Sequence, residues 1–117
     1  MSNQQNNFEV KDSGERKKFA SGMVRDSAEK TDFLLALDGP MFERWAEHLT
    51  KGARKYAPRN WMLAESQEEL DHAMQSLGHH FIQYVRGEVD EDHASAIFFN
   101  INLVEHIKAK LAKKKAA

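Results

Sequence analysis

Cysteine is absent from this 117-residue chain. Its absence excludes a disulfide framework, a thiolate zinc site and a cysteine nucleophile, so a bound metal ion would need oxygen and imidazole ligands. Long apolar runs are also missing. No stretch approaches the roughly 20 apolar residues of a membrane span, and the first twenty residues do not resemble a signal peptide. We therefore expect a cytoplasmic protein that does not bind membranes.

An excess of charge of either sign is lacking too, because 17 Lys and Arg balance 18 Asp and Glu. This balance argues against a general binder of nucleic-acid polymers. A charged ligand would have to be bound by a few side chains near its site rather than attracted by the net charge of the chain. A chain of 117 residues with 41% hydrophobic content is long enough for one compact domain and too short for two.

Apolar residues recur at helical spacing in three segments, which predicts an all-α fold. The first helix follows Asp38-Gly39-Pro40 and ends near Gly52. The second begins at a capping box formed by Ser66 and Glu69, stops at Gly87 and carries one apolar face: Leu70, Met74, Leu77, Phe81 and Val85. The third runs from about residue 91 toward residue 110, with Asp90 as its expected cap. The predicted architecture is a small helical bundle of three main helices with a long embedded loop.

The composition divides the chain into three parts. Residues 1–20 are mostly polar and cannot bury enough apolar surface to offset the entropy of ordering, so we expect a flexible, disordered arm. Residues 21–112 form the single helical domain, in which residues 21–37 are expected to be an extended or partly helical segment over the core. Residues 113–117 form a basic tail. No stretch alternates as a strand would.

The loop between the first two helices combines cations with aromatic rings. Its notable residues are Arg54, Lys55, Tyr56, Arg59, Asn60 and Trp61. Such a mixture can clamp phosphates and stack on a base. It is equally consistent with rings that cover the end of the bundle while the cations stay in water.

Helical phase separates the histidines of the second helix. His72 and His79 fall nearly opposite the apolar face, whereas His80 lies on its flank and is the better site candidate. On the third helix His93 and Asn100 share one stripe, and Asn100 points inward. A buried amide is costly unless it is hydrogen-bonded, so Asn100 makes either a structural hydrogen bond or a ligand contact.

An acidic turn precedes the third helix. Asp90-Glu91-Asp92-His93 places three carboxylates and an imidazole in four residues, and Mg²⁺ or Mn²⁺ accepts such ligands. Acidic residues also favour helix N-termini for electrostatic reasons, so a capped and solvated first turn is the alternative.

Several of these motifs together resemble a known family. They are Arg25-Asp26, Ala46-Glu47-His48, the run Lys51–Tyr56, Arg59-Asn60-Trp61, His80, Gly87-Glu88, Asp90–His93 and Asn100. In this combination the chain resembles the dATP/dGTP diphosphohydrolase N-terminal domain family, common in phages and prophages, over roughly residues 21–107. The resemblance implies cleavage of a purine deoxynucleoside triphosphate to monophosphate and pyrophosphate, in the host cytoplasm if a phage encodes the chain. It also implies that Arg25 belongs to the substrate-binding residues.

The sequence thus suggests a metal-dependent (deoxy)nucleoside triphosphate pyrophosphohydrolase. The expected ligands of Mg²⁺ or Mn²⁺ are Glu88, Asp90 and Asp92, and the expected catalytic residues are His80 and His93, either of which could also bind the metal. Substrate contacts are expected from Arg25, Lys55, Tyr56, Arg59, Asn60, Trp61 and Asn100.

Two other classes of function stay open. One is a non-catalytic protein that binds and sequesters a nucleotide, and the other is a structural protein-interaction module. A three-helix unit this short has little core, so we expect a homo-oligomer under every hypothesis.

Overall fold

The computed structural model describes residues 7–116, and the chain divides into two compact units between Phe33 and Leu34. Each unit is described by itself. Within the described residues no helix combines the length and apolar character needed to cross a membrane. The cytoplasmic location stays a prediction.

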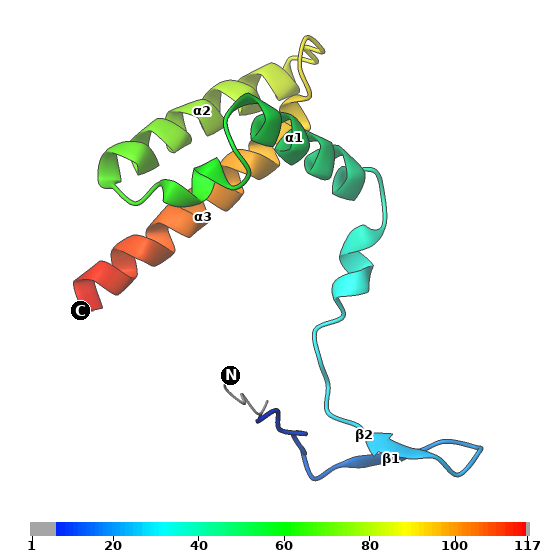
Figure 1. Cartoon of the computed structure of the whole chain (residues 1–117). Helices are drawn as coiled ribbons and strands as arrows, with labels where there is room; N and C mark the ends of the chain where they lie inside the picture. Colours follow the sequence, from blue (N-terminus) through cyan, green and yellow to red (C-terminus); the bar gives the residue numbers. More distant parts are fainter. Residues whose placement is uncertain (1–6, 117) are drawn as a thin grey trace. The chain divides into compact units, whose positions relative to one another are not determined.

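The first unit contains a β-hairpin (Figure 1). Strand β1, Arg16–Lys18, pairs antiparallel with β2, Val24–Asp26, and Lys17 lies opposite Arg25. The turn is closed by a hydrogen bond from the Phe19 N–H to the Met23 carbonyl, 2.8 Å.

The hairpin corrects one prediction. It supplies strands where none was expected, whereas the flexible arm and its boundary at residue 20 stay predictions. Local hydrogen bonds account for this order: the Asp26 carboxylate accepts from the Ser13 N–H at 2.7 Å, from the Ser13 hydroxyl, and from the Ala28 N–H at 2.9 Å. The same bonds lower the pKa of Asp26 to about 2. The part of the predicted arm at residues 1–6 lies outside the described residues.

Three α-helices make up most of the second unit, as the sequence predicts. They are α1 (Met41–Lys55), α2 (Gln67–Val85) and α3 (His93–Ala116), and α3 packs against both others (Figure 1). Two short 3₁₀ helices precede α1 and α2, namely η1 (Phe33–Leu37) and η2 (Asn60–Leu63). The predicted basic tail is the last turn of α3 in its described part, residues 113–116, and residue 117 lies outside the described residues.

Local signals fix the helix ends. The predicted capping box of α2 is present: Ser66 Oγ accepts from the Glu69 N–H at 3.2 Å, and the Glu69 carboxylate accepts from the Ser66 N–H at 3.1 Å. Gly87 follows α2 with a φ of 77°, a conformation that glycine adopts without strain. The predicted end of α1 near Gly52 is one turn too early, because the helix continues to Lys55.

The core between α2 and α3 is made of small side chains and polar groups. Its buried members on these two helices are Ala73, His93, Ser95, Ala96, Asn100, Val104 and Ile107. The predicted apolar face of α2 is turned outward in part, since Met74, Phe81 and Val85 leave 50%, 53% and 66% of their surface exposed. Ala73 and His80 face α3 instead. Alanine lets the two helix backbones approach closely, and His80 gains a hydrogen bond across the interface.

Candidate functional site

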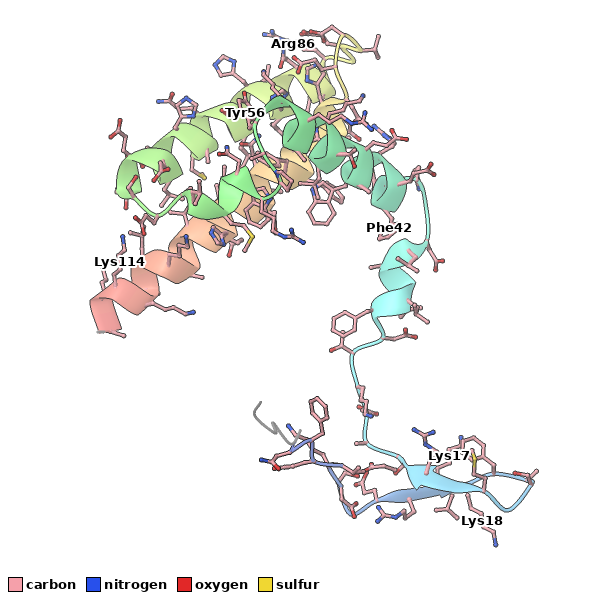
Figure 2. All side chains as sticks on the ribbon, viewed as in Figure 1. Lys17, Lys18, Phe42, Tyr56, Arg86 and Lys114 are labelled. Atoms are coloured by element: carbon pink, nitrogen blue, oxygen red, sulfur yellow. The ribbon has the colours of Figure 1, made fainter. Side chains whose placement is uncertain are left out.

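A pocket of about 950 Å³ opens between the C-terminal half of α1, the α1–α2 connection and the facing sides of α2 and α3. Five of the predicted substrate-binding residues line it: Tyr56, Arg59, Asn60, Trp61 and Asn100. Lys55 is not part of the lining, but its ammonium nitrogen lies 5.1 Å from the centre of the Tyr56 ring. Tyr56 follows directly on the end of α1 (Figure 2).

The pocket wall is held in place by short-range contacts. The Tyr56 N–H donates to the Gly52 carbonyl at 2.9 Å and ends α1. Trp61 stands edge-on to His106, with 5.1 Å between ring centres, and thereby rests on α3. Trp61 therefore covers part of α3, as expected for a ring that covers the bundle. It also lines the pocket, where a ring that stacks on a base would have to lie.

Arg59 has an unusual backbone conformation. Its φ of 61° and ψ of 24° place it in the left-handed region, which is strained for a side chain of this size. Such strain persists where surrounding structure enforces it and is concentrated at functional sites. Here it occurs at a cation in the wall of the pocket.

Asn100 makes the structural hydrogen bond that was one of its two expected roles, and its contact with a ligand stays a prediction. It is buried, and its Nδ2 donates to the Ala96 carbonyl at 2.9 Å, which is a structural hydrogen bond. It also lines the pocket.

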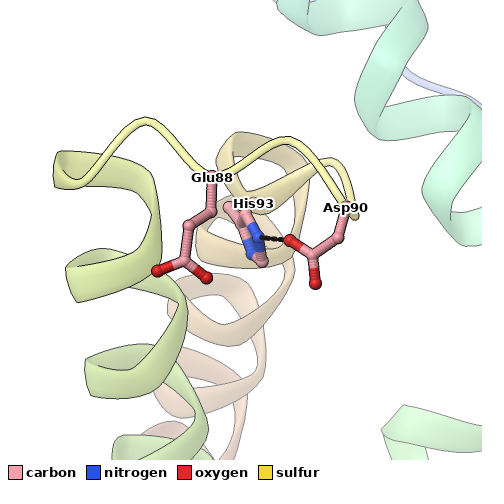
Figure 3. Close-up of side chains that lie close together, drawn as sticks. All are labelled: Glu88, Asp90 and His93. Carbon is pink, nitrogen blue, oxygen red and sulfur yellow. Dashed lines mark hydrogen bonds and ion pairs between the residues drawn. The ribbon is translucent and has the colours of Figure 1, made fainter.

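A cluster of imidazole and carboxylate groups lies at the start of α3 (Figure 3). The buried His93 side chain has its Nε2 at 2.8 Å from Asp90 Oδ1 and its Nδ1 at 2.9 Å from His80 Nδ1. One ligand atom each from Glu88, Asp90 and His93 lies within 4.8 Å of the others. The contact with His93 keeps the pKa of Asp90 below its usual value.

The donor set fits a divalent cation. It offers two exposed carboxylates and one buried imidazole, which are ligands that Mg²⁺ and Mn²⁺ accept in proteins. An ionised Asp90 accepts a hydrogen bond, so His93 Nε2 carries the proton and His93 Nδ1 accepts from His80. His80 thus fixes the ring orientation of His93, and His93 in turn orients Asp90. In this tautomer both nitrogens of His93 are used in hydrogen bonds, so the carboxylates of Glu88 and Asp90 are the groups free to bind a metal ion.

Asp92 has other partners than we expected. Arg44 donates to both carboxylate oxygens, at 2.6 and 2.9 Å, and Ser95 adds its N–H at 3.1 Å and its hydroxyl at 2.9 Å. These bonds hold the pKa of Asp92 far below its usual range, with Arg44 as the main cause. Asp92 caps α3 in the place where the sequence predicted Asp90, and it ties α1 to the start of α3.

His48 lies in the pocket wall although it is not among the predicted site residues; the sequence indicates it only as part of the Ala46-Glu47-His48 motif. It lines the pocket from α1, and its ring centre lies 5.3 Å from that of Phe99. Burial is the main cause of the lowered pKa of His48, while Asp92 opposes that shift and His80 adds to it. Along α3, the seven residues from His93 to Asn100 span about 10 Å. The cluster and the pocket are therefore close enough for one extended ligand to reach both.

His48 carries a prediction on pH. Because its folded pKa lies below the unfolded value near 6.5, its neutral form stabilises the fold above about pH 6.5, and this stability is lost as pH falls through the folded pKa. We expect the free energy of unfolding of the wild type to decrease from about pH 6.5 downward, and His48→Gln to flatten that slope. Urea denaturation at a series of pH values measures both. Equal slopes would show that His48 is not the responsible group.

The remaining predicted residue, Arg25, lies in the first unit. The β1–β2 hairpin places it opposite Lys17, so two cations face each other across the strands. The Phe19 ring centre lies 5.5 Å from Lys17 Nζ.

Comparison with known proteins identifies a family for this chain. A family model described as dATP/dGTP diphosphohydrolase, N-terminal, matches residues 21–115. No curated protein and no solved structure matches the chain.

Proposed function

Because the chain belongs to the dATP/dGTP diphosphohydrolase N-terminal family, we propose that it cleaves purine deoxynucleoside triphosphates to monophosphate and pyrophosphate with Mg²⁺ or Mn²⁺. The observation that carries this proposal is the pocket lined by cationic and aromatic residues, because Asn100 in its wall lies about 10 Å along α3 from His93 in the cluster of metal-binding groups.

The pocket supplies groups for each part of a nucleotide. Tyr56 or Trp61 stacks on the base, and Asn60 or Asn100 hydrogen-bonds to the base edge or the sugar. Arg59 and the nearby Lys55 neutralise charge on the phosphoryl oxygens. Arg25 is assigned to the substrate by the resemblance alone and is the least supported member of the set.

The cluster supplies the chemistry. The carboxylates of Glu88 and Asp90 would hold the divalent ion, with His93 orienting Asp90, and the ion would supply Lewis-acid activation of the phosphate and of the attacking water. His80 uses Nδ1 to orient His93, which leaves its Nε2 as the basic nitrogen that accepts the proton of the water. Attack at the α-phosphorus breaks the bond to the α–β bridging oxygen, and pyrophosphate leaves.

A second candidate function is nucleotide sequestration without turnover. It is favoured by one observation: both ring nitrogens of His93 are already engaged by Asp90 and His80, so the cluster is stable as an internal hydrogen-bond network. A sequestering protein would retain the pocket and need no bound metal.

The test is incubation of the purified protein with each nucleoside triphosphate in the presence of Mg²⁺ or Mn²⁺. Chromatography would follow monophosphate and pyrophosphate, and equilibrium dialysis would measure retained nucleotide. Metal-dependent pyrophosphate release with a purine preference supports the hydrolase. Retention without turnover overturns the hydrolase in favour of sequestration, and the absence of both overturns the two candidates.

A further inference from the structure

Helix α2 presents an apolar stripe that the other described elements of the second unit leave largely uncovered. The members recur at alternating steps of four and three residues: Leu70, Met74, Leu77, Phe81 and Tyr84. We call these residues the α2 stripe. Met74, Phe81 and Tyr84 leave 50%, 53% and 56% of their surface exposed, and Leu70 and Leu77 are half-buried. This repeat is the pattern by which helices pair along a seam.

We propose that two copies of the chain pair through the α2 stripe, antiparallel, about a two-fold axis near Leu77 and Gly78. This inference is independent of the proposed function. Pairing about that axis sets Met74 against the partner's Phe81 and sets Leu77 against the partner's Gly78. Thioether–aromatic contacts are favourable, and a large side chain facing a glycine allows close approach of the helices. Apart from its chain neighbours and the backbone of its own helix, no described heavy atom lies within 4 Å of the position that a Cβ on Gly78 would take, so that space is open to a partner.

The charges on α2 favour the antiparallel arrangement. Its acidic residues Glu68, Glu69 and Asp71 stand at the N-terminal end, and Arg86 follows its C-terminal end (Figure 2). In an antiparallel pair the basic C-terminal end of each α2 approaches the acidic N-terminal end of the partner's α2, whereas a parallel pair would bring like charges together. A chain whose stripe is complementary to itself in size and in charge is suited to a second copy.

The surface is large enough for a dimer. The 19 residues of α2 are about 28 Å long, and a face two helices wide is about 18 Å across. Its projected area is on the order of 500 Å², and its accessible area is larger, near the roughly 800 Å² per partner of a standard interface. By helical phase Ile97 and Ile101 of α3 border the same side, and Ile101 is 48% exposed.

The pairing leaves the candidate site accessible. His72 and Ser76, which line the pocket, lie on the opposite flank of α2 from Met74 and Phe81. Two copies can thus associate while each pocket stays open to ligand.

The absence of cysteine allows a sharp test. The doubly substituted Met74→Cys, Phe81→Cys chain should form disulfide-linked dimers under mild oxidation. In the antiparallel pair, the thiol introduced at position 74 of one copy lies next to the thiol introduced at position 81 of the other. Each single variant should cross-link at least tenfold less, since like positions in the antiparallel pair are separated along the helix. Gln75→Cys, an exposed position on the other flank, is the matched control.

Sedimentation and light scattering supply the second readout. The wild type should be a dimer, and Phe81→Glu should raise the dimer dissociation constant at least tenfold while circular dichroism shows the same helix content; Gln75→Glu should not. A monomeric wild type, or an equally stable dimer in Phe81→Glu, overturns the proposal. Efficient cross-linking of Phe81→Cys or Met74→Cys alone overturns the antiparallel arrangement.

Discussion

Replacing Asp90 by alanine is expected to weaken Mn²⁺ binding by at least about 100-fold, whereas replacing Asp92 by alanine should change it less than about threefold. The reason is the geometry of the acidic turn. Asp90 lies in the cluster with Glu88 and His93, while both oxygens of Asp92 are occupied by Arg44 and Ser95. If Mn²⁺ supports catalysis, pyrophosphate release should follow the same order. Titration of Mn²⁺ by isothermal calorimetry or by electron paramagnetic resonance measures the affinities.

Stability should show the reverse order. Asp92→Ala removes the cap of α3 and the link to α1, so we expect the free energy of unfolding to fall by about 1–2 kcal/mol, with the exposed ion pair contributing little of that sum. The folded pKa of Asp92 is depressed, so its contribution is present above the unfolded value near 4 and is lost as pH falls below it. Urea denaturation at pH 7 and at acid pH should therefore separate the wild type from Asp92→Ala at neutral pH and bring them together in acid.

Comparison of Asp90→Ala with Asp92→Ala decides which of the two carboxylates belongs to the metal site. Equal loss of Mn²⁺ affinity in both variants would return Asp92 to the metal site and contradict the assignment made from its hydrogen bonds. Unchanged affinity in both would remove the acidic turn from metal binding altogether. Glu91→Gln, an exposed neighbour outside the cluster, controls for the loss of one negative charge.

The features that the sequence predicts best are those fixed by residues close together in the chain. The capping box of Ser66 and Glu69 needs only a spacing of three, and the structure confirms it. The three helices follow from periodicity in the same way. The predicted end of α1 is less accurate because a glycine does not by itself stop a helix. The Tyr56 N–H still donates to the Gly52 carbonyl, as in a regular helix.

The packing of helices against one another is harder to predict from the sequence. Periodicity identifies which side chains share a face of α2, but it does not say which face meets α3. Ala73 and His80 occupy that contact because close packing and the His80–His93 hydrogen bond outweigh the burial of Phe81. The division of labour between Asp90 and Asp92 depends on Arg44, which lies 48 residues from Asp92 in the chain.

The amino-acid composition of the β1–β2 hairpin does not predict strands. Its strands carry Arg16, Lys17, Lys18 and Arg25, which are typical of a solvated segment. The order comes from Asp26 and its hydrogen bonds with Ser13 and Ala28, contacts that no hydropathy pattern records. Ser21-Gly22 in the turn was the available signal, with Gly22 at a φ of 95°.

Replacing Arg59 by glycine is expected to stabilise the fold and to weaken nucleotide binding. A non-glycine residue in the left-handed region costs about 1 kcal/mol or more, and glycine removes that cost while adding some entropy to the unfolded chain. The net gain in the free energy of unfolding should be about 0.5–1 kcal/mol. Loss of a guanidinium that binds phosphate should weaken affinity by about 10- to 100-fold, because charge-assisted hydrogen bonds are worth about 1.5–3 kcal/mol each.

Arg59→Lys separates the two effects. Lysine keeps the charge and the strained backbone, so the stability should stay near that of the wild type and the affinity should fall less than in Arg59→Gly. Urea denaturation and equilibrium dialysis with a purine deoxynucleoside triphosphate are the measurements. A stabilised Arg59→Gly protein that binds nucleotide as tightly as the wild type would disconnect the strain at Arg59 from the ligand. The opposite result, greater stability together with weaker binding, would show that the backbone strain at Arg59 is retained because it directs a phosphate-binding cation into the pocket.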